Sequence, residues 1–339
     1  KPAAESEAAA PAASEETAAP AEEAPEEAKK ITIGYISPGP DTWYLRAEEG
    51  AKWACDKAGV DFIAVNSNRD AEQETANIEN LINEGVDAIV ILSWNEQGCV
   101  TCAEKCAEAG IGCVVFDGCG VMDSHDIDIT GSVDFDWYSM GQTYVDWMNE
   151  TYPGEDYVYI NGTPDSLVCQ NVEASLKEAS SKEGSAQLLD VRYGQYDPET
   201  AANTAEDLVN SGLEFSIIGV INEDCAAAII TRLEDLGVKD QYHVFAENGS
   251  DAGVALLNAG TLEFTIASSP GLEGAIATFV AIDAINNDRE PNQNIACAIA
   301  SVTPADANNP EKVIPWAVDE KAWTSIICAN YPDLAYFFD

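Results

Sequence analysis

The stretch ITIGYISPGPDTWYLRAEEGAKWACDKAG, residues 31–59, decides the fold. It begins with a short apolar run typical of a buried strand and ends with a segment of helical period. The loop between them, ISPGPDTWY at 36–44, places Trp43 and Tyr44 beside each other at the end of the strand. Large aromatic rings are difficult to bury in such a loop, so the loop raises the question of what they contact.

The same alternation of short apolar runs and longer amphipathic segments continues along the chain. The strand candidates lie at 31–36, 61–66, 87–92, 113–117, 157–161, 187–193, 216–222 and 242–248. Segments of helical period, such as 71–85 and 197–212, lie between them. Near-continuous apolar strands that alternate with helices favour parallel sheets covered on both faces. The number of units predicts an α/β fold with two doubly wound lobes rather than one.

The charge balance of the chain excludes some classes of partner. With 16 basic and 60 acidic residues the formal net charge is -44. Such a chain repels phosphate backbones and anionic membrane surfaces, so we predict no binding to nucleic acid. No apolar run approaches the ~20 residues of a membrane helix. No strand-to-helix turn carries GxGxxG or a Walker lysine motif, so nucleotide binding has no support.

The first part of the chain differs in composition from the rest. Residues 1–28 are almost wholly Ala, Glu, Pro, Ser and Thr, with no Val, Ile, Leu or aromatic residue. Such a segment buries too little apolar area to offset the entropy of ordering, so we expect residues 1–30 to form a disordered, extended tether. A signal leader upstream and a lipid on a Cys just before Lys1 would anchor it outside the cytoplasm.

The loops after the expected strands hold the candidate ligand contacts, because doubly wound folds bind ligands beyond the carboxyl ends of their strands. The candidates are Asp41, Trp43, Tyr44, Trp94, Asp117, Asp165, Gln170, Tyr196, Asn222, Glu247, Asn248 and Ser268. They combine aromatic rings with neutral or acidic hydrogen-bonding groups. Sugars have C–H faces that pack on rings and hydroxyls that bond to such groups. We find no nucleophile with a neighbouring base, and we predict no catalytic residue, cofactor or metal.

The order of these motifs resembles the periplasmic sugar-binding proteins of the ribose and galactose type, the solute receptors of ABC importers. Residues 31–59 are similar to the family's first strand, aromatic loop and helix, and NRDAEQETANIENLINEGVDAIVI at 68–91 resembles its second helix and third strand. AGIGCVVFD at 109–117, VINEDCAAA at 220–228 and FTIASSPGLEGAIA at 264–277 fit later blocks.

The resemblance extends from about Ile31 to about Thr303 and implies two lobes joined by three crossing strands, with the ligand in the cleft between them. It implies an N-terminal lobe of 31–133 plus 267–299 and a C-terminal lobe of 134–266 plus 300–339. Closure of the lobes buries the ligand, and a membrane permease recognises the closed form. We expect a monomer, with the segment after Thr303 returning to the second lobe.

The resemblance also implies roles for single residues. Trp43 and Tyr44 match positions where the family packs aromatic rings on the sugar, and Tyr196 matches the ring from the other lobe. Asp41, Asp117, Asn222 and the Glu247/Asn248 pair match hydroxyl-binding positions. Where ribose receptors carry two arginines and a late amide, this chain has Gly118, Gln170 and Ser268. A pentose, an amino sugar, a polyol and a sugar of another size therefore all stay open.

Two other functions compete with transport. A ligand-sensing receptor for chemotaxis or a sensor kinase would share the same fold. A two-lobed sugar-processing enzyme would use a carboxylate pair, for which Asp41 and Asp117 are the candidates. A transcriptional repressor would need a basic helix-turn-helix in front, and the acidic tail excludes one.

The cysteines allow more than one interpretation. Cys99, Cys102 and Cys106 are spaced i, i+3 and i+7, with Cys113 and Cys119 close behind. Thiolates at such spacing bind zinc or an iron–sulfur cluster. The spacing also fits the buried stripe of one helix, in which free Cys acts as a small hydrophobe, and we favour this interpretation. A disulfide is a further alternative, with Cys99 and Cys102 the nearest pair.

A group of acidic residues resembles a calcium loop at first sight. Asp123, Asp126 and Asp128 lie close together, but the Gly and distal Glu of the calcium-loop motif are missing. We therefore interpret them as a solvated turn.

Overall fold

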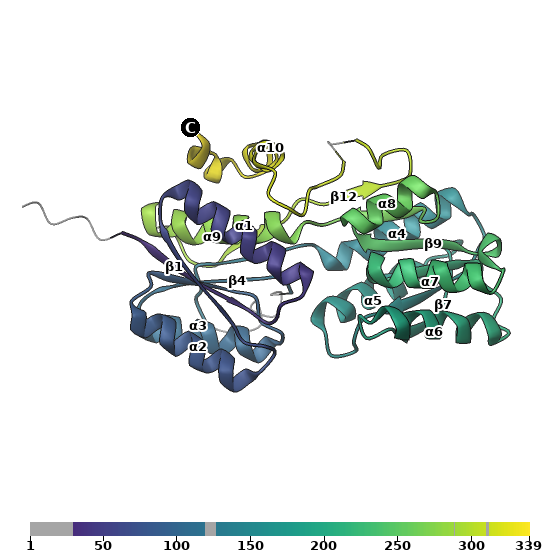
Figure 1. Ribbon diagram of the computed structural model, residues 1–339, viewed down its shortest axis with the longest axis horizontal. Coiled ribbons are helices and arrows are strands. Elements are labelled where there is room, and N and C mark those ends of the chain that lie inside the picture. Colours follow the sequence, from purple (N-terminus) through teal and green to yellow (C-terminus); the bar gives the residue numbers. More distant parts are fainter. Residues whose placement is uncertain (1–29, 119–126, 288, 310–311) are drawn as a thin grey trace, which may run out of the picture. The chain divides into compact units, whose positions relative to one another are not determined.

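The computed structural model describes residues 30–118, 127–287, 289–309 and 312–339 (Figure 1). The predicted tether, except for Lys30, lies outside the described residues, as do Cys119, Asp123 and Asp126. Within the described part, the chain forms two six-stranded sheets with helices packed on them. The prediction of two doubly wound α/β units is confirmed.

The first sheet is parallel throughout and has the order β11-β5-β4-β3-β1-β2. Its strands are β1 (Thr32–Ser37), β2 (Asp61–Asn66), β3 (Ala88–Ile91), β4 (Gly112–Phe116), β5 (Gly131–Asp134) and β11 (Gln293–Ala296). Its helices are α1 (Thr42–Ala58), α2 (Ala71–Glu84), α3 (Glu96–Ala109) and α9 (Pro270–Asn287). Two of its strands, β5 and β11, were not predicted; both have only four residues.

The second sheet has the order β12-β10-β9-β8-β6-β7 and is parallel except for β12, which pairs antiparallel with β10. Its strands are β6 (Tyr157–Asn161), β7 (Leu188–Tyr193), β8 (Ile217–Val220), β9 (His243–Asn248), β10 (Phe264–Ala267) and β12 (Ala300–Val302). Its helices are α4 (Trp137–Thr151), α5 (Leu167–Ser180), α6 (Pro198–Asn210), α7 (Glu223–Asp235) and α8 (Asp251–Ala259). No described helix is both long and apolar enough to cross a membrane.

The strands of the first sheet are apolar at successive positions because both faces of the sheet are covered. Tyr35 and Val90 belong to one apolar cluster that includes residues of α1 and α9. Ile36 and Ile89 belong to a second cluster that includes residues of α2 and α3. Since successive side chains of a strand point to opposite faces, a strand covered on both sides needs no polar face. The eight predicted strands are all present, each within two residues of its expected limits.

The chain passes between the two sheets three times, after β5, after β10 and after β11. These passages lie near the expected lobe limits at 134, 267 and 300. The division into lobes at those residues itself stays a prediction.

The C-terminal segment does not follow the expectation. It contains α10 (Glu320–Asn330) and a 3-10 helix at Pro332–Phe338, and both lie beside α1 and α9 (Figure 1). Trp323 packs against Trp53 of α1 at 5.4 Å between ring centroids, and Phe338 packs against Phe279 of α9 at 5.5 Å. The prediction that residues 300–339 return to the second lobe is therefore wrong for 320–338. The rings of Trp53 on α1 and Phe279 on α9 hold this segment by apolar packing, a long-range contact with no local sequence signal.

Candidate functional site

The carboxyl ends of several strands meet at one pocket of about 570 Å³. Ten of the twelve predicted contact residues line it: Asp41, Trp43, Tyr44, Trp94, Asp117, Asp165, Gln170, Tyr196, Glu247 and Asn248. They follow strands of both sheets, as the strand-end rule requires. Their contact with a ligand stays a prediction, but the structure places them together.

Trp43 is held at the pocket by its neighbours rather than by burial alone. Its indole Nε1 donates a hydrogen bond to Asp117 Oδ2 at 2.6 Å. The ring meets the edge of Trp316 at 5.3 Å and lies 6.3 Å from Trp137. Trp316 in turn donates from Nε1 to the carbonyl of Asn248 at 3.0 Å. The half-buried Trp43 ring is thus fixed in orientation and still lines the pocket.

Arg69 is a pocket residue that the sequence reasoning missed. Its guanidinium lies 4.1 Å from the centroid of Trp94 and 5.8 Å from that of Tyr44, and it pairs with the carboxylate of Asp41. Among the described residues that line the pocket, Arg69 is the single Lys or Arg. It follows β2, and applying the strand-end rule to the second strand would have found it. The cation holds the two rings and Asp41 in one group.

Asp117 sits in a strained and electrostatically unusual position. Its backbone has φ 59°, in the left-handed region, which turns the chain sharply at the end of β4. The carboxyl of Asp134 accepts hydrogen bonds from Gly118 N at 2.9 Å and from Trp137 Nε1 at 2.6 Å, which fixes this turn. Burial, and secondarily the neighbouring Asp134, raise the pKa of Asp117 to about 7. Trp137, a second missed residue, follows the short strand β5.

A group of three carboxyls lies under the pocket. The carboxyl oxygens of Asp117, Asp134 and Glu273 lie within 4.8 Å of one another. Glu273 is fully buried, and its oxygens have no hydrogen-bond partner within the described residues. Burial first, then Asp117 and Asp134, raises its pKa well above the ordinary value. These three carboxyls could accept a cation; without one, the neutral acid is the favoured form of Glu273.

Tyr196 lines the pocket from the loop after β7. Its backbone has φ 53°, and its hydroxyl lies 3.0 Å from Cys169 Sγ. The ring lies on Gly162, where a Cβ would come within 2.3 Å of it. Glycine is therefore required there for the ring to take this place. Asp165 and Gln170 line the same side and are exposed; Gln170 Nε2 donates to the carbonyl of Pro164 at 2.9 Å.

Glu247 and Asn248 end strand β9 at the pocket. Glu247 is 1 % exposed, and Tyr144 Oη donates a hydrogen bond to its Oε2 at 3.3 Å. Burial, followed by the charge of Glu223, raises the pKa of Glu247 to about 8. At neutral pH its carboxyl is therefore mostly protonated and can donate as well as accept a hydrogen bond.

Two predicted contacts do not reach the pocket lining. Asn222 is the N-cap of α7, and its Oδ1 accepts a hydrogen bond from Cys225 N at 2.9 Å. Ser268 is fully buried behind the pocket, and its backbone N donates to the carbonyl of Asn248 at 2.9 Å. Both follow strands, as predicted. The capping of a helix takes up the Asn222 oxygen, and the close packing of β10 covers Ser268.

The predicted cysteine stripe is present. Cys99, Cys102 and Cys106 on α3 and Cys113 on β4 are buried in the apolar cluster between α3 and the first sheet. The nine cysteines within the described residues are all free thiols, so the considered Cys99–Cys102 disulfide is not formed.

The pocket thus offers aromatic faces, carboxyls and amides, with one arginine that is already paired. Such a surface is suited to hold an uncharged or weakly cationic molecule with many hydroxyls, by ring stacking and by hydrogen bonds that either partner can donate.

The family model described as "Periplasmic binding protein domain" matches residues 33–289. The chain therefore belongs to the periplasmic binding proteins, and the resemblance stated from the sequence is confirmed.

Two curated relatives cover most of the chain. It is 22% identical over 241 residues to the D-xylose-binding periplasmic protein of Escherichia coli (strain K12), with 70% of this chain and 72% of that protein covered. It is 20% identical over 262 residues to the ribose import binding protein RbsB of Bacillus subtilis (strain 168), with 77% and 84% covered.

A solved structure shows the same fold. An ABC transporter solute binding protein from Bacillus halodurans C-125, crystallised with bound myo-inositol, matches with a TM-score of 0.73 at 20% identity. The match covers 84% of this chain and 98% of that chain. At this identity the likeness concerns the fold.

Proposed function

We propose that this protein captures a sugar or a sugar-like polyol in the pocket and delivers it to an ABC importer outside the cytoplasm. Its family consists of binding proteins. The relatives are named for D-xylose and for ribose, and the neighbouring structure holds myo-inositol. All three ligands are small molecules that carry several hydroxyls, which is the chemistry that the pocket lining suits.

One observation supports the proposal most strongly. Trp43 and Tyr44, after β1 of the first sheet, line the same pocket as Tyr196, after β7 of the second sheet. Aromatic rings from two sheets around one pocket of about 570 Å³ can stack on both faces of a single sugar ring. Carboxyls and amides surround these rings and match its hydroxyls.

The acidic lining bears on which sugar binds. The pocket lining contains one paired arginine and the carboxyls of five residues, Asp41, Glu96, Asp117, Asp165 and Glu247. Because acidic groups outnumber basic ones, an amino sugar is a candidate ligand, together with neutral pentoses, hexoses and polyols. An ammonium group would interact favourably with the ionised carboxylates of Asp117 and Glu247, so the binding of an amino sugar should tighten as pH rises from 6 to 8. A neutral sugar has no charge with which to make this interaction.

A thermal-shift panel of pentoses, hexoses, amino sugars and polyols tests the proposal, with amino acids and nucleosides as outgroups. A ligand at 100 times its dissociation constant adds ~2.7 kcal/mol of stability, so the melting temperature should rise by at least about 4 °C. Trp43→Ala and Tyr196→Ala should each weaken the binding ~30-fold or more, as truncation of a central aromatic contact does.

Tyr138→Ala is the matched control, because Tyr138 is 46 % exposed on α4 and does not line the pocket. It should leave the ligand response unchanged. A response only to amino acids or nucleosides, or one that the pocket variants leave intact, would contradict the sugar assignment. Recovery of a chemically altered sugar would favour the enzyme over the binding protein.

The finer parts of the assignment are proposals of the same kind. They are the lipid anchor upstream of the tether, the monomeric state, and the lobe limits at 134, 267 and 300. Membrane fractionation of cells that express the protein, and its mass in solution, check the first two.

A further inference from the structure

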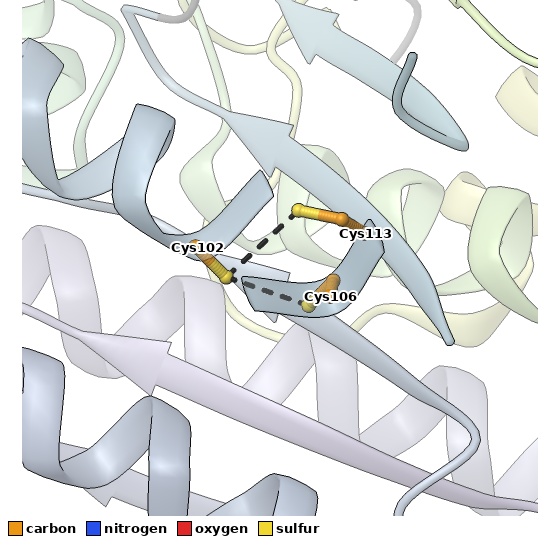
Figure 2. Close-up of side chains that lie close together, drawn as sticks. All are labelled: Cys102, Cys106 and Cys113. Atoms are coloured by element: carbon orange, nitrogen blue, oxygen red, sulfur yellow. Dashed lines mark hydrogen bonds between the residues drawn. The ribbon is translucent and has the colours of Figure 1, made fainter. Parts of the chain in front are cut away.

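Three thiols in the first sheet's core form a cluster that the sugar pocket does not use. Cys102 and Cys106 lie one turn apart on α3, and Cys113 lies on the adjacent strand β4 (Figure 2). The sulfur of Cys102 is 3.9 Å from that of Cys106 and 3.8 Å from that of Cys113. All three sulfurs lie within 4.8 Å of one another. Figure 2 shows the three side chains pointing toward a common centre from the helix and the strand.

The spacing of the sulfurs matches a three-coordinate site. The third separation, between Cys106 and Cys113, is at most 4.8 Å, so an ion at the centre of the three sulfurs would lie about 2.3–2.5 Å from each of them, close to the ~2.3 Å of a zinc–thiolate bond. A single soft ion could therefore bind all three sulfurs with little movement of the backbone. Such a fit requires three side chains from a helix and a strand to converge on one point. A buried stripe of small apolar residues along α3 would not require this convergence.

The number of ligands excludes the commoner thiolate sites. Structural zinc takes four ligands, and iron–sulfur clusters are held by four cysteines. Among the described residues, the group contains three. The zinc and iron–sulfur alternatives raised by the sequence thus lack a ligand here, and a centre that prefers three sulfurs fits better.

The surroundings favour a complex without net charge. The cluster lies among Ile78, Leu81, Ile89 and Val115, and each of its cysteines is at most 3 % exposed. Burying a net charge in such an apolar place is costly. Three thiolates balance a trivalent ion but leave a monovalent copper complex with a charge of two.

We propose that Cys102, Cys106 and Cys113 form a trithiolate site for a thiophilic trivalent ion of the arsenic(III) type. Arsenous acid, As(OH)₃, would react with the three thiols to form three As–S bonds. The three thiol protons leave with the three hydroxyls as three molecules of water. No electron is transferred, so the step needs no oxidant or reductant. The product is neutral and joins α3 to β4.

The test uses the full chain, reduced and kept without oxygen. Arsenite is added by slow incubation and, in parallel, during refolding, because the buried thiols need an opening of α3 to react. Excess arsenite is then removed, and arsenic is measured per chain. We expect about one arsenic per chain, and X-ray absorption should show three sulfur neighbours at about 2.3 Å.

Single variants identify the ligands. Cys102→Ala, Cys106→Ala and Cys113→Ala should each lower the retained arsenic at least ~10-fold, since a two-sulfur complex loses one of its bonds. Cys55→Ala is the matched control, because Cys55 is equally buried in α1, in the apolar cluster on the other face of the first sheet, and should leave retention unchanged. A cooperative thermal unfolding transition, measured without ligand, checks that each variant is folded.

Three outcomes would overturn the proposal: arsenic that is lost with the excess reagent, retention unchanged in the three variants, or an absorption spectrum with fewer than three sulfur neighbours. Retention of copper(I) but not of arsenite would overturn the trivalent assignment. If a variant fails to fold, the absorption spectrum of the wild-type protein still decides. The sugar response is measured separately, so either proposal can fail without the other.

Discussion

Buried carboxyls make single residues sensitive to pH. Glu247 is the clearest case, since burial raises its pKa to about 8, whereas an unfolded Glu titrates near ~4.3. Between these values the folded protein holds a proton that the unfolded chain has released. The contribution of Glu247 to stability is therefore fully favourable at low pH, falls as pH rises from about 4 to about 8, and changes no further above that.

Replacing this carboxyl by an amide should remove its part of the pH dependence. Glu247→Gln keeps the shape of the protonated acid, so its melting temperature should stay near that of the wild type at pH 5. It should exceed the wild type by at least about 2 °C at pH 8, the shift that ~1 kcal/mol produces in a domain of this size.

Melting curves at intervals from pH 5 to pH 9 measure this difference. The exposed Glu84→Gln serves as the control and should show no pH-dependent difference from the wild type. If the melting temperatures of Glu247→Gln and of the wild type change equally with pH, Glu247 is ionised in the folded protein and the account of its burial is contradicted.

The residues of the pocket were predictable where they directly follow a strand. Trp43 and Asp117 were found in this way, because the carboxyl ends of parallel strands share one edge of a sheet. Arg69 was missed because the loop after the second strand was not considered. Trp137 was missed because β5 has only four residues and little apolar periodicity. The orientation of Asn222, which depends on the first turn of α7, could not be read from the sequence.

At the scale of elements, Asn222 tests whether a strand-end residue serves the helix or the ligand. Its side chain caps α7 and lies outside the pocket lining. Asn222→Ala should therefore lower the free energy of unfolding by ~0.5–2 kcal/mol and leave the affinity for the panel ligand unchanged. Asp197→Ala, which removes the matching cap of α6, should behave alike.

Urea unfolding and a ligand titration on the same variants measure the two effects. A loss of affinity in Asn222→Ala that Asp197→Ala does not share would restore Asn222 as a ligand contact.

The C-terminal elements make a second prediction at this scale. Trp323 of α10 is fully buried against Trp53, and its Nε1 donates to the carbonyl of Pro315 at 3.0 Å. Trp323→Ala should cost ~3–5 kcal/mol of stability, as truncation of a large core side chain does.

Urea unfolding provides the measurement, with Val318→Ala as the control, because Val318 is exposed just before α10 and its truncation should have little effect. A small effect of Trp323→Ala would show that the segment is not packed on α1 in solution.

The elements themselves were predictable because their signals are local. All eight predicted strands are present, and the predicted helices at 71–85 and 197–212 correspond to α2 and α6. The docking of residues 320–338 depends on rings distant in the sequence: Trp53 lies 270 positions before Trp323, and Phe279 lies 59 positions before Phe338. No local pattern encodes such a contact, so the expected return to the second lobe was wrong.

At the scale of the whole molecule, two covered parallel sheets follow from the alternation of apolar strands and helices. The sequence did not predict β12, whose antiparallel pairing with β10 departs from the otherwise parallel pattern. The net charge of -44 disfavours anionic partners for the molecule as a whole. It does not identify the solute, which depends on the groups around the pocket.

The central claim is that one solute contacts loops of both sheets. Hydrogen–deuterium exchange of the wild-type protein, with and without the strongest ligand of the panel, tests it directly. We expect slower exchange both at 41–46, after β1, and at 193–197, after β7, with no change at the distant turn 211–216. Protection confined to the loops of one sheet, or found only away from the pocket, would contradict the account.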